Sequence, residues 1–400
     1  MIISAHQPMS VLTQVLFEPS PSLQDSVTYD ITAWALPYAR GLKAYAAKSR
    51  IKPNASYDFA NPKMPQVIEE KPYSYIFKWN SLEDAAFLST LLQNKVKVRY
   101  AQKSFTTSSS TFPPGSLVIT RADNKHLKTA FDEVIQATAY QHNRTLNTTT
   151  TGFMNAGVDF GSGNIDLITK PEILAVYGDG VNSNSYGQVW HYFENTIQYP
   201  FTAITKAQLS SIDLSDYNTL VLTDGSYSIN DKVIDWIRAG GKLVAIGRAN
   251  GSLSNSTFKL KRKDTPKNST GTDLKSKVKK YGDQVGSYIS NSTPGAIFGL
   301  TIDETHPLAY GISDSYFSIK TSTTAYEVSE DLWNVGYIDE APMSMGFVGE
   351  KAKQKINGSV VLATQSLGRG QVVYFVDNPL YRSFWDSGKF LMSNALFMVE

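Results

Sequence analysis

The chain has 400 residues, a formal net charge of +2 at pH 7 and no cysteine. The absence of cysteine excludes disulfide bonds, thiolate metal sites and cysteine nucleophiles, and the balanced charge gives no overall field that would attract nucleic acid. No run of about 18 apolar residues occurs, so we expect no membrane span. At roughly 150 residues per domain the length predicts two or three domains, and the apolar share of 42% is typical of globular proteins.

The first 168 residues are predicted to form a small α/β module with a lead-in. In the lead-in, the apolar residues of Val11–Phe17 alternate as in a strand, and residues 32–48 are typical of a helix that starts or breaks at Pro37. Residues 52–72 contain four prolines and indicate a linker. Strands then alternate with helices, the strands at 73–78, 96–100 and 116–121 and the helices at 82–92 and 124–142.

Residues 169–400 are predicted to form a second, larger α/β domain. Its strands at 173–177, 219–222 and 242–246 are continuous apolar runs, which is typical of central parallel strands covered on both faces. Because helices separate these strands and the connections are short, we expect a doubly wound, flavodoxin-like or amidotransferase-like parallel sheet. Further elements are predicted as helices around 186–197 and at 229–239 (capped by Ser228), strands at 295–302, 358–364 and 371–376, and an amphipathic helix at 384–399.

One segment of the second domain is much more basic than the rest of the chain. Residues 255–282 contain nine Lys and Arg against two Asp, and few apolar residues. Such a segment buries too little apolar area to offset an ordering entropy of roughly 1–2 kcal/mol per residue, so we predict a mobile, dispensable basic insertion. A site for an acidic partner is the alternative.

A zinc site is suggested by His191-Tyr-Phe-Glu194, the H-x-x-E spacing that supplies two ligands in zinc carboxypeptidases, with His306 as a candidate third ligand. The motif lies inside a predicted helix, whereas the carboxypeptidase motif lies in a loop at a strand end. Residues at i and i+3 share one helix face, so His191 and Glu194 can simply hydrogen-bond each other. We therefore expect no metal and no cofactor.

Amidotransferase chemistry is a second possibility. Class I glutamine amidotransferases hold a cysteine on a strained strand-to-helix turn, where the thiolate faces its base and an oxyanion hole. By strand order this turn lies at Gly247–Asn250, with Gly247 at the nucleophile position. Without a cysteine the glutaminase reaction cannot run, so we assign no catalytic residue.

The carboxyl ends of parallel strands gather at one edge of a doubly wound sheet, and ligands bind there. Gly178-Asp179-Gly180 precedes a helix whose N-terminus could hold an anion, although a tight turn that needs glycine explains the motif equally. Ser226 lies in a polar loop that helps to cap the next helix and could alternatively act as a nucleophile. The candidate ligand crevice comprises Gly178, Asp179, Gly180, Asp224, Ser226, Arg248 and Asn250.

Six stretches resemble, in the same order, the region downstream of the catalytic domain in large bacterial zinc carboxypeptidase-like proteins of the Bacteroidetes type. They are Val15–Pro19, Asp25–Tyr38, Phe112–Ser116, Tyr186–Glu194, His306–Gly311 and Asp377–Trp385. In that family a signal peptide and a metallopeptidase domain come first, and the last part is class I glutamine amidotransferase-like. The resemblance implies an exported parent that hydrolyses peptides with zinc, and it carries no zinc ligand into this chain.

Three functions remain open at this point. The first is a non-catalytic accessory region that packs on or positions the upstream peptidase domain of the same polypeptide. The second is a binding module for a peptide, glycan or small molecule at the sheet-end crevice. The third is an unrecognised hydrolase that uses Ser226, Asp179 or Asp224.

The first function predicts a particular surface. Residues 1–50 are rich in large apolar groups, which one strand and one helix cannot bury by themselves. We expect an exposed apolar patch near Val11–Phe17 or Trp34–Tyr45, or self-association through residues 11–45 that covers it.

Overall fold

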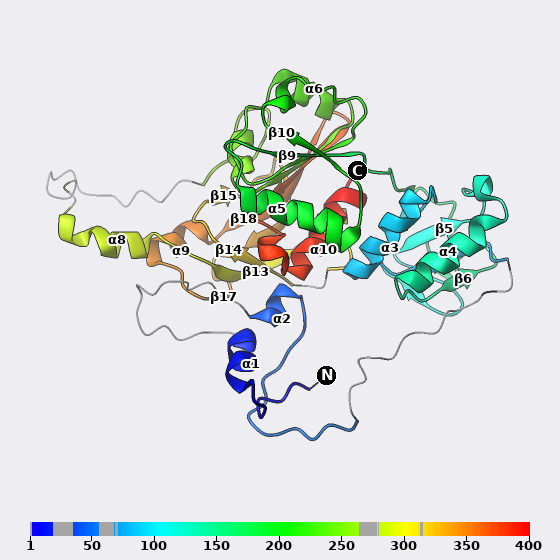
Figure 1. Cartoon of the computed structure of the whole chain (residues 1–400), viewed down its shortest axis with the longest axis horizontal. Helices are drawn as coiled ribbons and strands as arrows, with labels where there is room; N and C mark the ends of the chain where they lie inside the picture. Colours follow the sequence, from blue (N-terminus) through cyan, green and yellow to red (C-terminus); the bar gives the residue numbers. More distant parts are fainter. Residues whose placement is uncertain are drawn as a thin grey trace.

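The computed structural model describes residues 2–18, 35–55, 68, 71–263, 278, 280–312 and 315–400. Two bodies of α/β structure lie side by side, and the N-terminal segment lies along the larger one (Figure 1). The sequence expectations for residues 19–34, most of the proline-containing stretch 52–72, and residues 264–277 fall outside the described residues.

The smaller body is built on a five-stranded sheet of order β6-β1-β5-β2-β8, in which every paired strand is antiparallel. Its elements are β1 (Ser74–Phe77), α3 (Leu82–Gln93), β2 (Arg99–Ala101), β5 (Leu117–Thr120), α4 (Ala130–Gln141), β6 (Asn147–Thr149) and β8 (Ile165–Leu167). β1-α3-β2 and β5-α4-β6 are two interleaved crossover units, the connectivity of the split β-α-β motif. A small sheet of β3 (Phe105–Thr106), β4 (Thr111–Phe112) and β7 (Ala156–Gly157) is attached to it.

The helix predicted after residue 81 begins as expected. The Ser81 hydroxyl accepts a hydrogen bond from the backbone N–H of Asp84, a side-chain N-cap. The helix predicted over 124–142 is divided: a 3₁₀ turn at Lys125–Leu127 ends at Lys128, whose φ is +51°, and α4 begins at Ala130.

The larger body is built on an eleven-stranded mixed sheet with the main order β10-β9-β11-β12-β19-β18-β16-β13-β14. The parallel part contains β10 (Thr202–Thr205), β9 (Ile173–Tyr177), β11 (Thr219–Leu222), β12 (Lys242–Ile246) and β19 (Gly370–Phe375). The antiparallel part contains β18 (Ser359–Leu367), β16 (Trp333–Ile338), β13 (Ala296–Ile302) and β14 (Tyr316–Lys320), with β15 (Tyr326–Glu327) and β17 (Ser344–Met345) off the main path.

The doubly wound parallel sheet expected for this domain is not confirmed, because about half of its strands pair antiparallel. The apolar runs at 173–177, 219–222 and 242–246 are central parallel strands, as predicted. However, the last strands return as antiparallel neighbours, and a local apolar run does not determine the direction of its partner. The chain is a mixed α/β protein.

Among the helices of the larger body, the one expected around 186–197 is present, whereas two others differ from their predictions. α5 (Ser183–His191) passes directly into a π-helical turn at Tyr192–Ile197. α6 (Asp231–Arg238) is capped by Asn230, whose side chain accepts from Val233 N, and not by Ser228. α10 (Asp386–Phe397) is not amphipathic, because all residues from Gly388 to Phe397 are buried.

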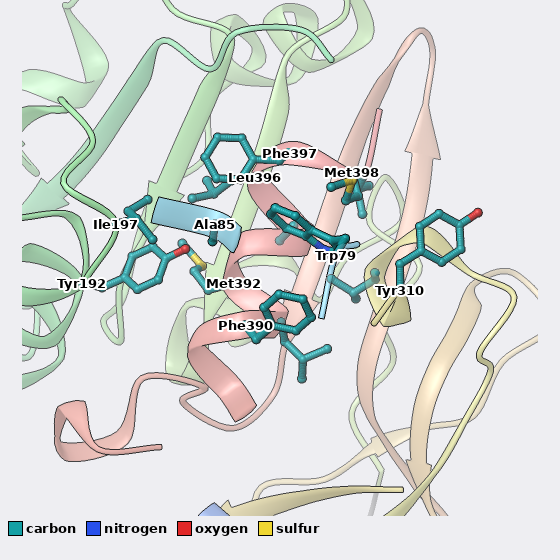
Figure 2. Packing of buried hydrophobic residues seen from close by; sticks show 14 of the residues in the cluster. Trp79, Ala85, Tyr192, Ile197, Tyr310, Phe390, Met392, Leu396, Phe397 and Met398 are labelled. Carbon is teal, nitrogen blue, oxygen red and sulfur yellow. The ribbon is translucent and has the colours of Figure 1, made fainter. Parts of the chain in front are cut away.

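α10 is buried because it lies between the two bodies. One connected apolar core contains residues of both sheets and of this helix. Figure 2 shows Trp79, at the end of β1, packed against Phe390 and Phe397 of α10, with ring centroids 5.3 and 6.4 Å away. Tyr192, on the other side of α10, hydrogen-bonds Ser393 at 2.8 Å. The domain boundary that was predicted near residue 168 thus separates two sheets that share one apolar core.

The N-terminal segment differs from its prediction. Val11–Phe17 belongs to a helix, α1 (Ser10–Phe17), and not to a strand. The helix expected over 32–48 is reduced in the described residues to the single turn α2 (Leu36–Ala39), after which Gly41 takes a left-handed backbone with φ +61°. α2 contacts β14 and α10, whereas α1 contacts α2 (Figure 1).

The basic insertion is packed where it begins. Phe258 and Leu260 are buried in the core of the larger body, and the backbone of Lys261 and Lys263 hydrogen-bonds β15 and its neighbour Ala325. The expectation of a mobile segment is thus wrong for residues 255–263. Phe258 and Leu260 alternate with charged or polar residues and point inward, but the high charge of the segment as a whole did not indicate this.

We expect Phe258→Ala to lower the free energy of unfolding by about 3–4 kcal/mol, because it removes a fully buried ring and leaves a cavity. Denaturant unfolding of the full chain measures the change. Phe153→Ala is the matched control, since Phe153 is exposed and should cost less than about 0.5 kcal/mol. Equal effects in the two variants would contradict the packing of residues 255–263.

Candidate functional site

The carboxyl ends of β9, β11 and β12 meet at one edge of the sheet and carry the predicted crevice residues. The loop after β9 is tied to the loop after β11, because Val181 and Gly225 form a β-bridge and Asn182 N donates to Asp224 O at 2.7 Å. The Asn182 side chain also caps α5 by accepting from Ser185 N. These backbone contacts hold the two loops close together.

The glycines after β9 allow the backbone to make the tight turn that follows this strand. Gly178 and Gly180 have φ of +101° and +78°, values that L side chains rarely adopt. A Cβ on Gly180 would also lie 2.9 Å from Lys206 Nζ, so the Lys206 side chain lies over this loop. A tight turn is therefore enough to explain why glycine occurs at both ends of Gly178-Asp179-Gly180. Asp179 itself is exposed.

Asp224 and Arg248 form the polar centre of this edge. Asp224 Oδ1 accepts from Arg248 Nε at 2.6 Å and from Arg248 N at 3.3 Å, and Asp224 N donates to Ser185 Oγ at 3.1 Å. The guanidinium is mostly exposed and the carboxylate partly buried. The sequence predicted both residues for the same edge of the sheet but gave no sign that they pair with each other.

The expected strand-to-helix turn is present at Gly247. β12 runs directly into a 3₁₀ helix at Gly247–Leu253, and Gly247 has φ +61°. A Cβ at this position would meet Asp224 Cγ at 3.2 Å and Asp224 Cβ at 3.3 Å. The space where an amidotransferase would project its nucleophile is thus crowded by the carboxylate that Arg248 holds.

Asn250 does not lie at a surface as predicted, whereas Ser226 lies in the expected polar loop but does not cap the next helix, which Asn230 caps. Asn250 is fully buried and donates to Gly247 O and Phe375 O at 2.8 and 2.7 Å, so it links β12 to β19 instead of lining a surface. Its Oδ1 has no hydrogen-bond partner among the described residues. Ser226 is exposed, and its backbone N–H donates to Gly180 O at 3.2 Å.

An aromatic surface beside the crevice was not predicted. The rings of Tyr177 and Tyr186 lie 5.2 Å apart, and Trp190 follows Tyr186 by four residues on the same helix face. Tyr177 and Trp190 are exposed. Burial, and then the neighbouring Tyr177, raise the pKa of Tyr186 above its ordinary value. The i, i+4 spacing of Tyr186 and Trp190 was the available sequence signal.

The H-x-x-E residues do not meet His306. His191 lies at the end of α5, its Nδ1 buried without a hydrogen-bond partner in the described structure, while Glu194 is exposed on the π-helical turn. His306 accepts from Leu308 N through Nδ1 at 3.1 Å, so Nε2 carries the proton and donates to Thr364 Oγ1 at 3.0 Å. Across the described ranges no group of three His, Cys, Asp or Glu side chains is arranged to hold a metal ion.

Burial lowers the pKa of His306 to about 4. The unfolded chain takes up this proton near the ordinary value of 6.5, so the free energy of unfolding should fall as the pH drops from 6.5 toward 4, by up to about 3 kcal/mol. We expect His306→Gln to remove this part of the pH dependence of stability. His6→Gln, at an exposed histidine, serves as the control and should keep the wild-type slope.

No protein-family model matches the sequence, and no curated protein does. Among solved structures, a glutamine amidotransferase from Thermotoga maritima is similar, with 10% identity and a TM-score of 0.35, over 56% of this chain and 96% of its own. A ThuA-like protein from Parabacteroides merdae is 14% identical with a TM-score of 0.34, over 57% of this chain and 89% of its own. An exo-β-1,4-mannosidase from an Opitutaceae bacterium is 10% identical with a TM-score of 0.35, over 57% of this chain and 36% of its own.

The neighbours therefore include glutamine amidotransferase-like structures at low identity. At these scores the similarity transfers no residue and no activity to this chain. Within the described residues, no helix has both the length and the apolar character needed to cross a membrane.

Proposed function

We propose that this chain is a non-catalytic accessory region that packs on the peptidase domain of an exported zinc carboxypeptidase-like protein. The observation that carries the proposal is α1, which buries none of its eight residues against the described part of the chain. Val11 is 73% exposed, and Leu12, Val15 and Phe17 are exposed as well.

Further large apolar side chains are exposed after α2. Leu42 and Tyr45, which follow α2, are 59% and 94% exposed. Several large apolar side chains exposed in one segment are typical of a region that meets another domain. The N-terminal apolar surface, defined as Val11, Leu12, Val15, Leu42 and Tyr45, is the expected contact with the peptidase.

The crevice supports the non-catalytic part of the proposal. Gly247 offers no nucleophile, and the Asp224–Arg248 pair crowds the place where one would project. We expect no release of ammonia from glutamine above a buffer blank. Release that a Gly247 or Arg248 substitution abolishes would show that another nucleophile acts there.

Binding between this chain and the separately expressed peptidase region of the same gene tests the main proposal. We expect Val11→Asp/Val15→Asp to weaken binding about tenfold or more, because each change buries a charge in an apolar contact. Gln14→Asp is the control, since it places one Asp at another exposed position of the same helix without removing an apolar side chain.

Two outcomes would overturn the assignment to a peptidase. One is an upstream reading frame without a peptidase. The other is a dimer of this chain that dissociates with Val11→Asp/Val15→Asp but not with Gln14→Asp, which would make a second copy the partner.

A second candidate function is favoured by the aromatic surface of Tyr177, Tyr186 and Trp190. Exposed rings beside polar loops suit a binding module for a glycan or peptide. Titration with oligosaccharides and peptides, followed by tryptophan fluorescence, should then give a signal that Trp190→Ala removes and that Trp333→Ala, at another exposed tryptophan, retains.

A further inference from the structure

A basic surface lies on the smaller body, where the loop after α3 meets the loop that contains the 3₁₀ turn before α4. The Asn124 side chain joins the two loops, because it accepts from Lys97 N at 2.7 Å and donates to Lys97 O at 2.9 Å. His126 Nε2 donates to Lys95 O at 2.9 Å. The exposed basic side chains of these two loops, which we call the basic patch, are Lys95, Lys97, Lys125, His126 and Lys128.

The lysines of the basic patch are not paired with acidic side chains. Residues 71–168 contain ten Lys and Arg against seven Asp and Glu, a formal charge of +3, whereas the other 302 residues have 28 against 29, a formal charge of −1. The three arginines of this stretch form ion pairs with Asp84, Asp123 and Asp132. No ion pair between described residues includes a lysine of the basic patch. The positive charge of the smaller body is therefore carried by lysines, and four of them lie in these two loops.

Two of these lysines have a backbone conformation that disfavours a side chain. Lys95 follows α3 with φ +60°, and Lys128 follows the 3₁₀ turn with φ +51°. Lys95 N donates to Leu92 O at 3.1 Å and Val96 N donates to Leu91 O at 3.0 Å, which is the helix ending whose left-handed position glycine usually occupies. A lysine within the last turn of α3 would interact with the helix carbonyls without this strain. Stabilisation of the helix end thus does not explain lysine at this position, and strained residues concentrate at ligand sites.

We propose that the basic patch binds an acidic polysaccharide, that is, a sugar polymer with carboxylate or sulfate groups on its repeating units. Lysine ammonium groups are point charges on flexible stems, so they can follow anionic groups spaced along a polymer without a fixed geometry. Because the patch is exposed, a polymer can cross it without entering a pocket.

Nucleic acids and folded proteins fit the basic patch less well. The patch contains no arginine fork to contact base edges and no aromatic ring on which a base could stack. It also contains no large apolar side chain, whereas the centre of a protein interface is apolar and often aromatic. Repeated positive charge is the only chemistry that this surface offers to a ligand.

The affinity of the full chain for soluble polysaccharides tests the proposal. Polygalacturonate carries carboxylates, heparin carries sulfates as well, and dextran is the neutral comparison. We expect binding to at least one of the acidic polymers, none to dextran, and weaker binding as sodium chloride is raised. Lys97→Glu/Lys125→Glu should weaken binding about tenfold or more. Lys351→Glu/Lys353→Glu makes the same charge change at exposed positions of α9 (Glu350–Ile356) and should bind as the wild type does.

The left-handed lysines give a second measurement. Lys95→Gly/Lys128→Gly should weaken binding but raise the midpoint of denaturant unfolding, because glycine adopts this backbone without strain. Lys97→Gly/Lys125→Gly removes two charges where the backbone is not left-handed, so it should lower both the affinity and the midpoint. Wild-type affinity in Lys95→Gly/Lys128→Gly would overturn the proposal.

Three other results would also overturn it. One is binding to neither acidic polymer, and another is an equal loss in the α9 variant. The third is duplex DNA bound as tightly as the acidic polysaccharide, which would make the ligand a nucleic acid. The basic patch is separate from the aromatic surface, since α5 belongs to the larger body (Figure 1). Trp190→Ala should therefore bind the acidic polymer as the wild type does, and a loss in this variant would assign the polymer to the aromatic surface instead.

Discussion

Asn394→Ala is expected to lower the free energy of unfolding by about 3–5 kcal/mol, because one buried amide satisfies three groups at the junction of the two sheets. Its Oδ1 accepts from Trp79 Nε1 at 2.6 Å, and its Nδ2 donates to Leu308 O and Tyr310 O at 2.9 and 2.8 Å. Without the amide, the indole N–H and both carbonyls are left buried and unpaired. Chemical denaturation followed by circular dichroism measures the loss.

Asn184→Ala is the control for this variant, since Asn184 is exposed on α5 and should change stability by less than about 0.5 kcal/mol. Trp79→Phe provides a second comparison, because it removes only the N–H donor. If Asn394→Ala lowered the free energy of unfolding no more than Asn184→Ala does, the conclusion that the two bodies share a buried core would be wrong.

The second large effect is expected at the buried ion pair between β14 and the end of β19. Lys320 Nζ lies 3.0 Å from Asp377 Oδ1, and Ser318 Oγ donates to Asp377 Oδ2 at 2.8 Å. The Lys320 side chain is 0% exposed and that of Asp377 8%. Lys320→Met should cost about 3–5 kcal/mol, because it leaves an uncompensated buried carboxylate.

The double variant Lys320→Met/Asp377→Leu should be more stable than Lys320→Met, since no unpaired charge remains. The exposed pair Arg238–Asp235 is the control, and Arg238→Met should cost less than about 1 kcal/mol. A Lys320→Met variant as stable as Arg238→Met would show that water reaches Asp377.

Only part of the candidate site could be predicted from the sequence. Strand order placed Asp224 and Arg248 at one edge, and the glycine at 247 indicated the strand-to-helix turn, because both follow from local pattern and parallel topology. The burial of Asn250 depends on Phe375 O, a contact with a strand 125 residues away. No local pattern encodes such a contact.

The sequence by itself determined the elements whose signals are local. The capping serine of α3 and the apolar runs of β9, β11 and β12 are specified by neighbouring residues, through side-chain caps and burial on both faces. Only the tertiary structure decided the direction of β18, β16 and β13, the complete burial of α10 and the inward position of Phe258. These features arise from pairing and packing between distant segments, and a residue's own neighbours in the chain do not determine which surface it meets.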